Sequence, residues 1–112
     1  MSAGKKMDVD DPLLREVVKR LIQAYEPERI YLFGSKARGQ AGPDSDYDLM
    51  VLVPENAPPH RRRSRLAYES LWGTGVAADV LVWTSEAFEK RLHLKASLPS
   101  TILDEGRLLY GA

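Results

Sequence analysis

Two apolar runs separated by a short polar loop constrain the fold of this chain more than any other feature of its sequence. The first run, Arg29–Phe33, is rich in β-branched and aromatic residues, as buried strands are, and leads directly into Gly34 and Ser35. The second, Tyr47–Val53, is nearly continuous in apolar residues and stops at Pro54, which cannot donate to a sheet ladder. The two runs therefore predict neighbouring strands of one sheet, the second of them central.

Helical spacing of apolar residues and the residues that cap helices predict the elements around these strands. Asp11 can cap a helix, Pro12 suits its first position, and the apolar pattern that follows continues to Tyr25. The other predicted elements are a short helix at 35–39, a helix at 60–72, a strand at 76–83, a helix from Thr84 or Ser85, a helix from Pro99 to Asp104 or Glu105, and an edge strand at 107–110. This order predicts an α/β (α+β) fold, with a mixed β-sheet of about four strands flanked by helices.

Length and composition indicate one small unit and exclude some kinds of site. With 112 residues the chain can bury one core, so residues 11–112 are predicted to form a single domain behind a flexible, polar tail at residues 1–10. The absence of cysteine and the presence of only two histidines exclude a thiolate or zinc site. A metal bound by oxygen ligands remains open.

Charge and hydropathy bear on partners and location. Sixteen basic residues balance 16 acidic ones, and this zero net charge argues against direct, sequence-independent binding of nucleic acid. The basic cluster His60–Arg65 is interpreted as a solvated or partner-facing surface. No apolar run approaches membrane-spanning length and the N-terminus lacks the apolar core of a signal peptide, so we expect a cytoplasmic protein without membrane contact. Several aromatic residues are expected in or beside the core: Tyr31, Tyr47, Tyr68, Trp72 and Trp83.

Three aspartates are the candidate catalytic and metal-binding residues. Asp46 and Asp48 lie two positions apart at the start of a predicted strand, so their side chains project to one face, about 6–7 Å apart along the chain. Asp79 lies inside a predicted apolar strand, where a carboxylate without a partner or a metal is costly. If that strand lies beside Tyr47–Val53, three carboxylates could hold Mg²⁺, as two ions about 3.5–4 Å apart, and Asp79 could take the proton of an attacking hydroxyl.

Gly34 and Ser35 are the candidate phosphate-binding residues. They stand where a strand passes into a helix, where unpaired backbone N–H groups attract anions and a missing Cβ lets a phosphate approach. Lys36 and Arg38 follow within one turn and could neutralise a polyphosphate, although either could instead point to solvent. Each residue also has a simpler reading, because Ser35 alone is often a helix cap and acidic pairs are common where loops end. Their occurrence together favours a metal-bound nucleoside triphosphate.

The spacing of these residues resembles a known signature. Gly34-Ser35 is followed by ten residues, 36–45, and then by Asp46-Tyr47-Asp48. This pattern resembles that of the minimal nucleotidyltransferases (MNT) of the DNA polymerase β-like nucleotidyltransferase superfamily. The segment around Asp79 and the closing EGRLLYG also resemble the family, so that the likeness extends over nearly the whole chain after residue 10.

The resemblance implies a polymerase β-like nucleotidyltransferase fold and transfer of AMP from ATP to a hydroxyl, with loss of pyrophosphate. In this reading Asp46 and Asp48 hold Mg²⁺, Asp79 completes the site and activates the acceptor, and Gly34-Ser35 binds the triphosphate. Many members of the family are antitoxins of HEPN-domain toxins, and some AMPylate a tyrosine of the toxin. A separate HEPN chain, in complex with this one, is therefore the expected partner.

Two other functions remain open from the sequence. The chain could neutralise its partner by contact alone, with a vestigial site. It could also transfer a nucleotide to a small molecule, although a chain of this length leaves no room for a second domain that would form an acceptor pocket.

Overall fold

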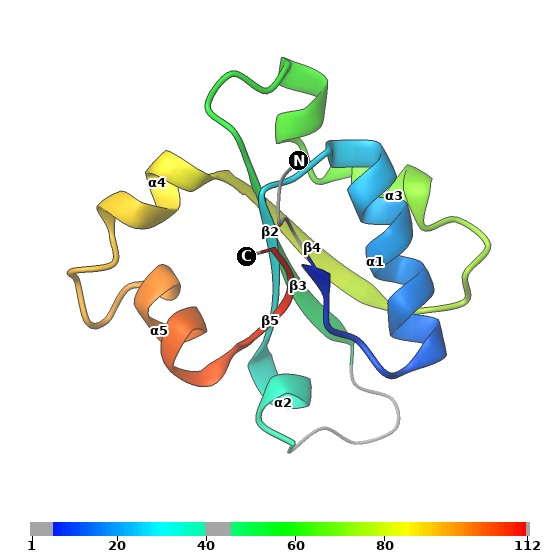
Figure 1. Ribbon diagram of the computed structural model, residues 1–112, viewed down its shortest axis with the longest axis horizontal. Coiled ribbons are helices and arrows are strands. Elements are labelled where there is room, and N and C mark those ends of the chain that lie inside the picture. Colours follow the sequence, from blue (N-terminus) through cyan, green and yellow to red (C-terminus); the bar gives the residue numbers. More distant parts are fainter. Residues whose placement is uncertain (1–5, 40–45, 112) are drawn as a thin grey trace.

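The computed structural model of this protein describes residues 6–39 and 46–111, which form one mixed sheet with helices on both of its faces (Figure 1). Its elements are β1 (Lys6–Met7), α1 (Pro12–Tyr25), β2 (Arg29–Phe33), α2 (Gly34–Ala37), β3 (Tyr47–Val53), a 3₁₀ helix (Pro59–Arg62), α3 (Arg65–Ser70), β4 (Ala78–Thr84), α4 (Ser85–Lys90), α5 (Leu98–Glu105) and β5 (Arg107–Gly111). The strand order is β1-β5-β2-β3-β4, with β3 and β4 parallel and the other pairs antiparallel. The predicted fold class, a mixed sheet flanked by helices, is confirmed.

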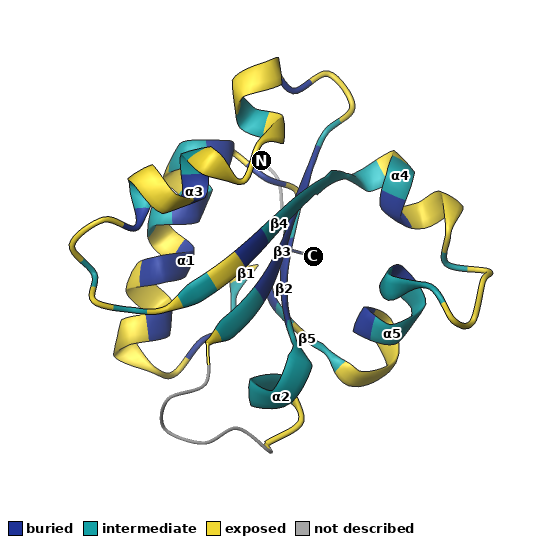
Figure 2. Cartoon of the chain, turned by 180° about the vertical axis from the view of Figure 1, so that it is seen from behind, coloured by how far each residue is buried: buried dark blue, intermediate teal, exposed yellow. Residues whose placement is uncertain are grey.

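Alternation along β3 divides the core into two layers. Leu49, Val51 and Val53 join the cluster that contains the buried face of α1, together with Ala67 of α3. Met50 and Leu52 point the other way and pack with residues of α4 and α5. Both figures agree with this division, since α1 and α3 lie on one side of the sheet and α4 and α5 on the other (Figure 2).

The first helix and the two central strands have the predicted bounds. Asp11 accepts a hydrogen bond from the Leu13 N–H (3.0 Å) and Pro12 occupies the first turn, so α1 begins where its capping chemistry is strongest. β3 lies between β2 and β4, and its residues from Leu49 onward are all buried, which confirms the prediction of a central strand.

Both chain ends differ from the prediction. The segment expected to be a flexible tail contributes β1, whose Lys6 and Met7 pair with Gly111 and Tyr110, and Val9 is 5% exposed; residues 1–5 lie outside the described part. The prediction of an edge strand at the C-terminus is wrong, because β5 lies between β1 and β2. A two-residue strand is too short to give a sequence pattern, so this covering of β5 could not be read from the sequence.

The predicted helix at 60–72 is instead a 3₁₀ turn followed by the six-residue α3. Arg63 between them has extended backbone angles (φ −114°, ψ 140°), and its carbonyl accepts a hydrogen bond from the Tyr25 hydroxyl (2.5 Å) rather than from a helical N–H. The Arg62 guanidinium donates back to the carbonyls of Ala57 (2.9 Å) and Glu55. These tertiary contacts outweigh the local helical pattern.

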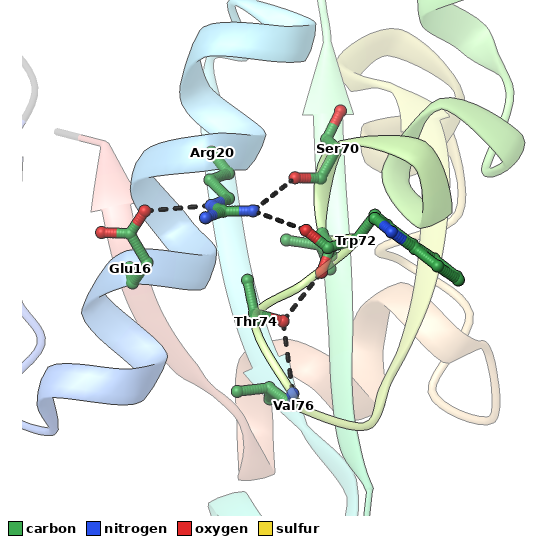
Figure 3. A network of polar contacts seen from close by, with 7 residues as sticks. Glu16, Arg20, Ser70, Trp72, Thr74 and Val76 are labelled. Carbon is green, nitrogen blue, oxygen red and sulfur yellow. Dashed lines mark hydrogen bonds and ion pairs between the residues drawn. The ribbon is translucent and has the colours of Figure 1, made fainter.

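Arg20 of α1 fixes the loop that leads from α3 to β4 (Figure 3). Its guanidinium donates to the carbonyls of Ser70 (3.3 Å) and Trp72 (2.9 Å) and pairs with Glu16 (3.0 Å). Trp72, which was expected on the core side, is 85% exposed, and Arg20 binds its backbone carbonyl. The contact therefore orders the entry to β4 without using this aromatic side chain.

None of the helices within the described ranges is long and apolar enough to cross a membrane.

Candidate active site

The Gly-Ser turn and the Asp-x-Asp strand meet directly. Gly34 begins α2 immediately after β2 and has φ +75°, a conformation that L side chains rarely adopt. A Cβ at this position would collide with Oδ2 of Asp48, which lies on the neighbouring strand β3. Glycine is thus required both by the backbone angle and by the approach of the carboxylate, and an anion bound at the turn would lie beside Asp48.

The first N–H groups of α2 are the candidate phosphate donors. The N–H groups of a helix's first turn have no partners within the helix, and Ser35 stands among them with a half-buried side chain. Since α2 has only four residues, the backbone donors and the Ser35 hydroxyl would contribute more to binding an anion than the helix dipole would.

The parallel register of β3 and β4 brings Asp79 beside Asp48. These two residues are paired across the strands, and paired residues on neighbouring strands project to the same face. Asp46 lies just before β3 and two positions from Asp48, on the same alternation. The three predicted carboxylates are therefore gathered at one end of the sheet, on the face that α4 and α5 cover.

One premise of the sequence prediction is wrong. Asp79 was expected to be costly inside an apolar strand without a partner or a metal, but β4 is the last strand of the described sheet and Asp79 is exposed. Its position beside Asp48, rather than any cost of burial, is what makes it a candidate site residue.

The carboxylates sense one another electrostatically. Partial burial raises the pKa of Asp48 above its ordinary value, and the negative charges of Asp79 and Asp46 raise it further, while the positive charge of Arg38 opposes the shift. The ionised form of Asp48 is thus disfavoured in the protein alone. A bound cation would remove that penalty.

The described acidic residues do not make a metal site by themselves. Within residues 6–39 and 46–111, no group of three His, Cys, Asp or Glu side chains is arranged to hold an ion by itself. Mg²⁺ commonly takes only one or two carboxylates and completes its shell with substrate phosphates and water. Asp46, Asp48 and Asp79, next to a phosphate-binding turn, fit an ion that arrives with a nucleoside triphosphate.

The two candidate cations lie differently. Lys36 Nζ is 4.5 Å from the centroid of the Tyr47 ring, and Tyr47 alternates with Asp46 and Asp48 along the strand, so it projects to the opposite face. Arg38 pairs with Glu105 at the end of α5 (3.4 Å) and lies near enough to Asp48 to influence its pKa. The structure therefore brings Arg38, but not Lys36, toward the carboxylates.

Two supporting residues were not predicted as part of the site. Asp11 accepts a hydrogen bond from the Tyr47 hydroxyl (2.9 Å), which links the start of α1 to the Asp-x-Asp segment. Glu105 holds Arg38 across 67 positions of sequence. The sequence showed Asp11 only as a helix cap, and no local pattern marks a contact as distant as that of Glu105.

Known proteins share both the sequence and the fold of this chain. The family model described as "Nucleotidyltransferase domain" matches residues 14–109. A relative from Methanocaldococcus jannaschii, named as a candidate protein adenylyltransferase, is 29% identical over 103 residues, which cover 90% of this chain and 98% of the relative.

Two solved structures have the same fold. A chain from a crystal structure of a toxin–antitoxin with AMP-PNP has a TM-score of 0.58 and 23% identity, covering 88% of this chain and 73% of that one. A chain from a variant of the toxin–antitoxin MntA–HpeT has a TM-score of 0.56 and 21% identity, covering 94% of this chain and 75% of that one. The family match spans most of the sequence, and the protein therefore belongs to the nucleotidyltransferase domain family of enzymes.

Proposed function

We propose that this protein is a Mg²⁺-dependent protein adenylyltransferase, which transfers AMP from ATP to a hydroxyl, with a tyrosine of a HEPN-domain toxin as the acceptor. The observation that carries the proposal is the contact of the Gly34 turn with Asp48, whose neighbour in the parallel register is Asp79. A phosphate-binding turn next to clustered carboxylates is what transfer from a nucleoside triphosphate requires.

In the proposed reaction, each residue acts on a defined part of the substrates. The α2 N–H groups and Ser35 bind the triphosphate, and Arg38 balances its charge. The three aspartates hold Mg²⁺, which when bound stabilises charge on the reacting phosphate and on the leaving group. Asp79 accepts the proton of the acceptor hydroxyl, whose oxygen bonds to the α-phosphorus while the bond from that phosphorus to the bridging oxygen breaks and pyrophosphate leaves.

The proposal of a toxin partner has two supports. The two solved structures described above are both structures of a toxin–antitoxin, and the Gly-Ser and Asp-x-Asp spacing resembles that of antitoxins paired with HEPN proteins. We propose that the chain acts as an antitoxin by AMPylating its partner within a complex. We also propose that the protein acts in the cytoplasm.

The test is transfer of label to the partner. The full chain is incubated with Mg²⁺, ATP labelled at the α-phosphate, and a cognate HEPN protein. We expect the partner to be labelled, and we expect Asp48→Asn or chelation of Mg²⁺ to reduce the rate more than about 100-fold, because both remove the metal site. Equal labelling of the HEPN protein by the wild type and by Asp48→Asn would overturn the metal assignment. Absence of label from the HEPN protein with the wild-type enzyme would overturn the proposed transfer of AMP.

One observation favours a second candidate, neutralisation by contact without catalysis. Tyr68 and Trp72 are 56% and 85% exposed and line one pocket together with Arg65 and Glu69, an aromatic surface of the kind that binds a partner. The double variant Asp46→Asn/Asp48→Asn distinguishes the two functions in cells that express the toxin. Loss of protection supports catalysis, whereas full protection by a variant that still forms the complex supports neutralisation by contact.

A further inference from the structure

Strand β4, which carries the candidate site residue Asp79, has an outer edge that is unpaired among the described residues. β4 has seven residues and is last in the strand order, and none of the described segments pairs with its outer side. It crosses the foreground of Figure 2 from one end of the sheet to the other. A long open edge offers a template for another extended chain, and proteins usually cover or interrupt such edges.

The hydrogen bonds of β3 show which backbone groups of β4 are free for such pairing. The Tyr47 N–H donates to the Ala77 carbonyl (3.0 Å), so Ala77 directs its backbone toward β3. By the two-residue period, Asp79 and Leu81 do the same, and the alternate residues, Ala78, Val80 and Val82, direct their N–H and C=O groups outward. Apart from the sheet ladder, no described residue hydrogen-bonds these outward groups.

Asp79 would face the side chain that an added strand places opposite it. A new strand would lie about 4.8 Å from β4, with opposed Cβ atoms about 4.5–5.5 Å apart and on the same face. Asp79 is exposed on the face of the sheet where Asp48 also projects. A hydroxyl side chain opposite Asp79 would therefore stand beside the carboxylate that is proposed to take its proton.

The other end of the same edge has a basic pocket. A cavity of about 560 Å³ is lined by Trp83, Thr84 and Val82 of β4, by Ala87 and Arg91 of α4, and by Arg62. The Arg91 guanidinium lies 5.6 Å from the Trp83 ring centroid. Arg62 donates to the carbonyls of Ala57 and Glu55, and its ion pair with the Glu55 carboxylate is long, at 3.8 Å, so that a better-placed carboxylate could replace that pair.

The spacing of Asp79 and Trp83 determines which residues of an added strand could contact both of them. They are four residues apart, about 13 Å along a strand, and an even separation keeps both side chains on one face. A bound strand would thus present to this face the residue opposite Asp79 and the residue four positions away from it.

We propose that β4 binds the acceptor polypeptide as an added β-strand, with the hydroxyl residue opposite Asp79 and an acidic residue four positions away between Trp83, Arg62 and Arg91. The role of Asp79 in this proposal rests on the proposed function, whereas binding at the edge requires no catalysis. The edge thereby specifies an acceptor by two features, an extended backbone and the interval between hydroxyl and carboxylate.

The binding test uses a synthetic peptide, Lys-Thr-Val-Tyr-Thr-Val-Thr-Glu-Lys, and the ¹⁵N-labelled full chain. We expect the peptide to slow hydrogen exchange at the outward amides of Val80 and Val82, while those of Asp79 and Leu81 stay as they are. Two N-methylated peptides, one modified at Tyr and alternate residues and one at the intervening residues, provide matched controls, because only one edge of the peptide can pair with β4. The glutamate follows the tyrosine in this peptide, so it reaches the Trp83 pocket only if the peptide runs parallel to β4. In that pairing the backbone of the residue opposite Asp79 faces β4, and the peptide methylated at Tyr and alternate residues should bind about tenfold more weakly. Equal affinity of the two, or protection elsewhere than β4, overturns the proposal.

The pocket has its own control. Replacing the glutamate of the peptide by lysine should weaken binding several-fold, since it sets a positive charge against Arg62 and Arg91. An unchanged affinity would overturn the assignment of the acidic residue to this pocket.

A pair of variants tests the edge in the protein itself. Ala78→Pro removes an outward N–H without breaking the ladder to β3, and Ala78→Val adds bulk but keeps the N–H. We expect the proline variant alone to lose about tenfold in peptide affinity, with ATP affinity unchanged in both. Full peptide affinity in Ala78→Pro contradicts the edge proposal.

Adding ATP and Mg²⁺ then separates the two hypotheses. If the peptide binds at β4 but is never adenylylated, and the HEPN protein is not adenylylated either, only the proposed function is contradicted. Transfer to the HEPN protein that Ala78→Pro leaves unchanged contradicts only the edge proposal.

Discussion

At the scale of single residues, the candidate site contains a charge and a backbone conformation that are unfavourable in the protein without a ligand. Asp48 is half-buried between two other carboxylates, which raises its pKa, and Gly34 adopts a positive φ directly beneath it. Such arrangements are common at functional sites, because the ligand supplies the compensating charge.

Replacing Asp48 by asparagine should stabilise the metal-free protein while it abolishes transfer. The folded-state pKa of Asp48 is raised, so its ionised form opposes folding at pH values above the unfolded pKa, and this penalty disappears as the pH falls and the group is protonated. We expect Asp48→Asn to raise the free energy of unfolding by about 0.5–1 kcal/mol at pH 7 in EDTA, discounted for solvent screening, and by little near pH 4.

Thermal unfolding at the two pH values measures this effect, and Asp79→Asn serves as the control, because Asp79 is more exposed and should gain less. A variant Asp48→Asn less stable than the wild type at pH 7 would contradict the account of charge repulsion.

Gly34→Ala should be more destabilising than the same change at Gly39. Both glycines have similar positive φ values, +75° and +71°, but a Cβ at Gly34 collides with Asp48, whereas no described atom lies within 4 Å of one at Gly39. We expect Gly39→Ala to lower the free energy of unfolding by about 1 kcal/mol. Gly34→Ala should lower it by about 1–2 kcal/mol more, because the Asp48 carboxylate must be displaced.

Urea denaturation of both variants gives the difference, which isolates the collision from the backbone strain. ATP affinity should fall in Gly34→Ala only. Equal losses of stability at the two positions would show that Asp48 moves aside without cost.

At the scale of elements, contacts between helices and strands position the acidic segment. Tyr47 donates its hydroxyl to the cap residue of α1, while Lys36 of α2 lies over its ring, so the residue between the two aspartates is held on the face away from the site. Arg20 in turn ties α1 to the loop that enters β4. α1 thus supports both strands that carry carboxylates.

Tyr47→Phe should weaken this support in a pH-dependent way. The hydrogen bond from Tyr47 is the largest cause of the lowered pKa of Asp11, so its stabilisation is present above the unfolded pKa of Asp11 and is lost as the pH falls through the folded pKa. We expect a loss of about 0.5–1 kcal/mol at pH 7, discounted for solvent screening, and a smaller loss at pH 3, where more of Asp11 is protonated than at pH 7.

Equilibrium unfolding at the two pH values tests this prediction. Asp11→Asn, which keeps a cap but not the charge, should show a similar loss at pH 7. A loss in Tyr47→Phe that is the same at both pH values would mean that the ring packing, rather than the bond to Asp11, was altered.

Trp72→Ala should leave stability nearly unchanged, although a tryptophan at the end of a helical pattern suggests a core residue. Its side chain is 85% exposed, so we expect a change below about 0.5 kcal/mol. The neighbouring Leu71, which is 9% exposed, provides the control, with about 2–4 kcal/mol lost in Leu71→Ala. A large loss in Trp72→Ala, measured by urea unfolding, would contradict the arrangement of α3.

At the scale of the whole molecule, one sheet collects the site from distant segments. β2 supplies the turn at Gly34, β3 supplies Asp48, and β4 supplies Asp79, with α5 adding Glu105 beside Arg38. The two faces of the sheet differ, since α1 and α3 cover one of them (Figure 1). The register of β3 and β4 directs Asp48 and Asp79 to the other face. The open edge of β4 is where the molecule can extend that sheet toward a partner.

The sequence by itself determined the elements whose causes are local. The cap at Asp11, the proline at Pro12 and the helical period gave α1, and composition gave the bounds of β2 and β3. The spacing from Gly34-Ser35 to Asp46 and Asp48 indicated a nucleotidyltransferase for the same reason, because these residues lie in one continuous segment.

Only the tertiary structure decided which strands are neighbours. The parallel register sets Asp79 beside Asp48, the order of the sheet leaves Asp79 exposed at an edge, and the packing of α5 turns Arg38 toward the carboxylates while Tyr47 draws Lys36 away. Periodicity reports which face of a strand is apolar, but it carries no information on the partner of that strand. Pairing depends on contacts between residues far apart in the chain. Asp79 could therefore be identified as a candidate from the sequence, but only the fold shows that it lies beside Asp48.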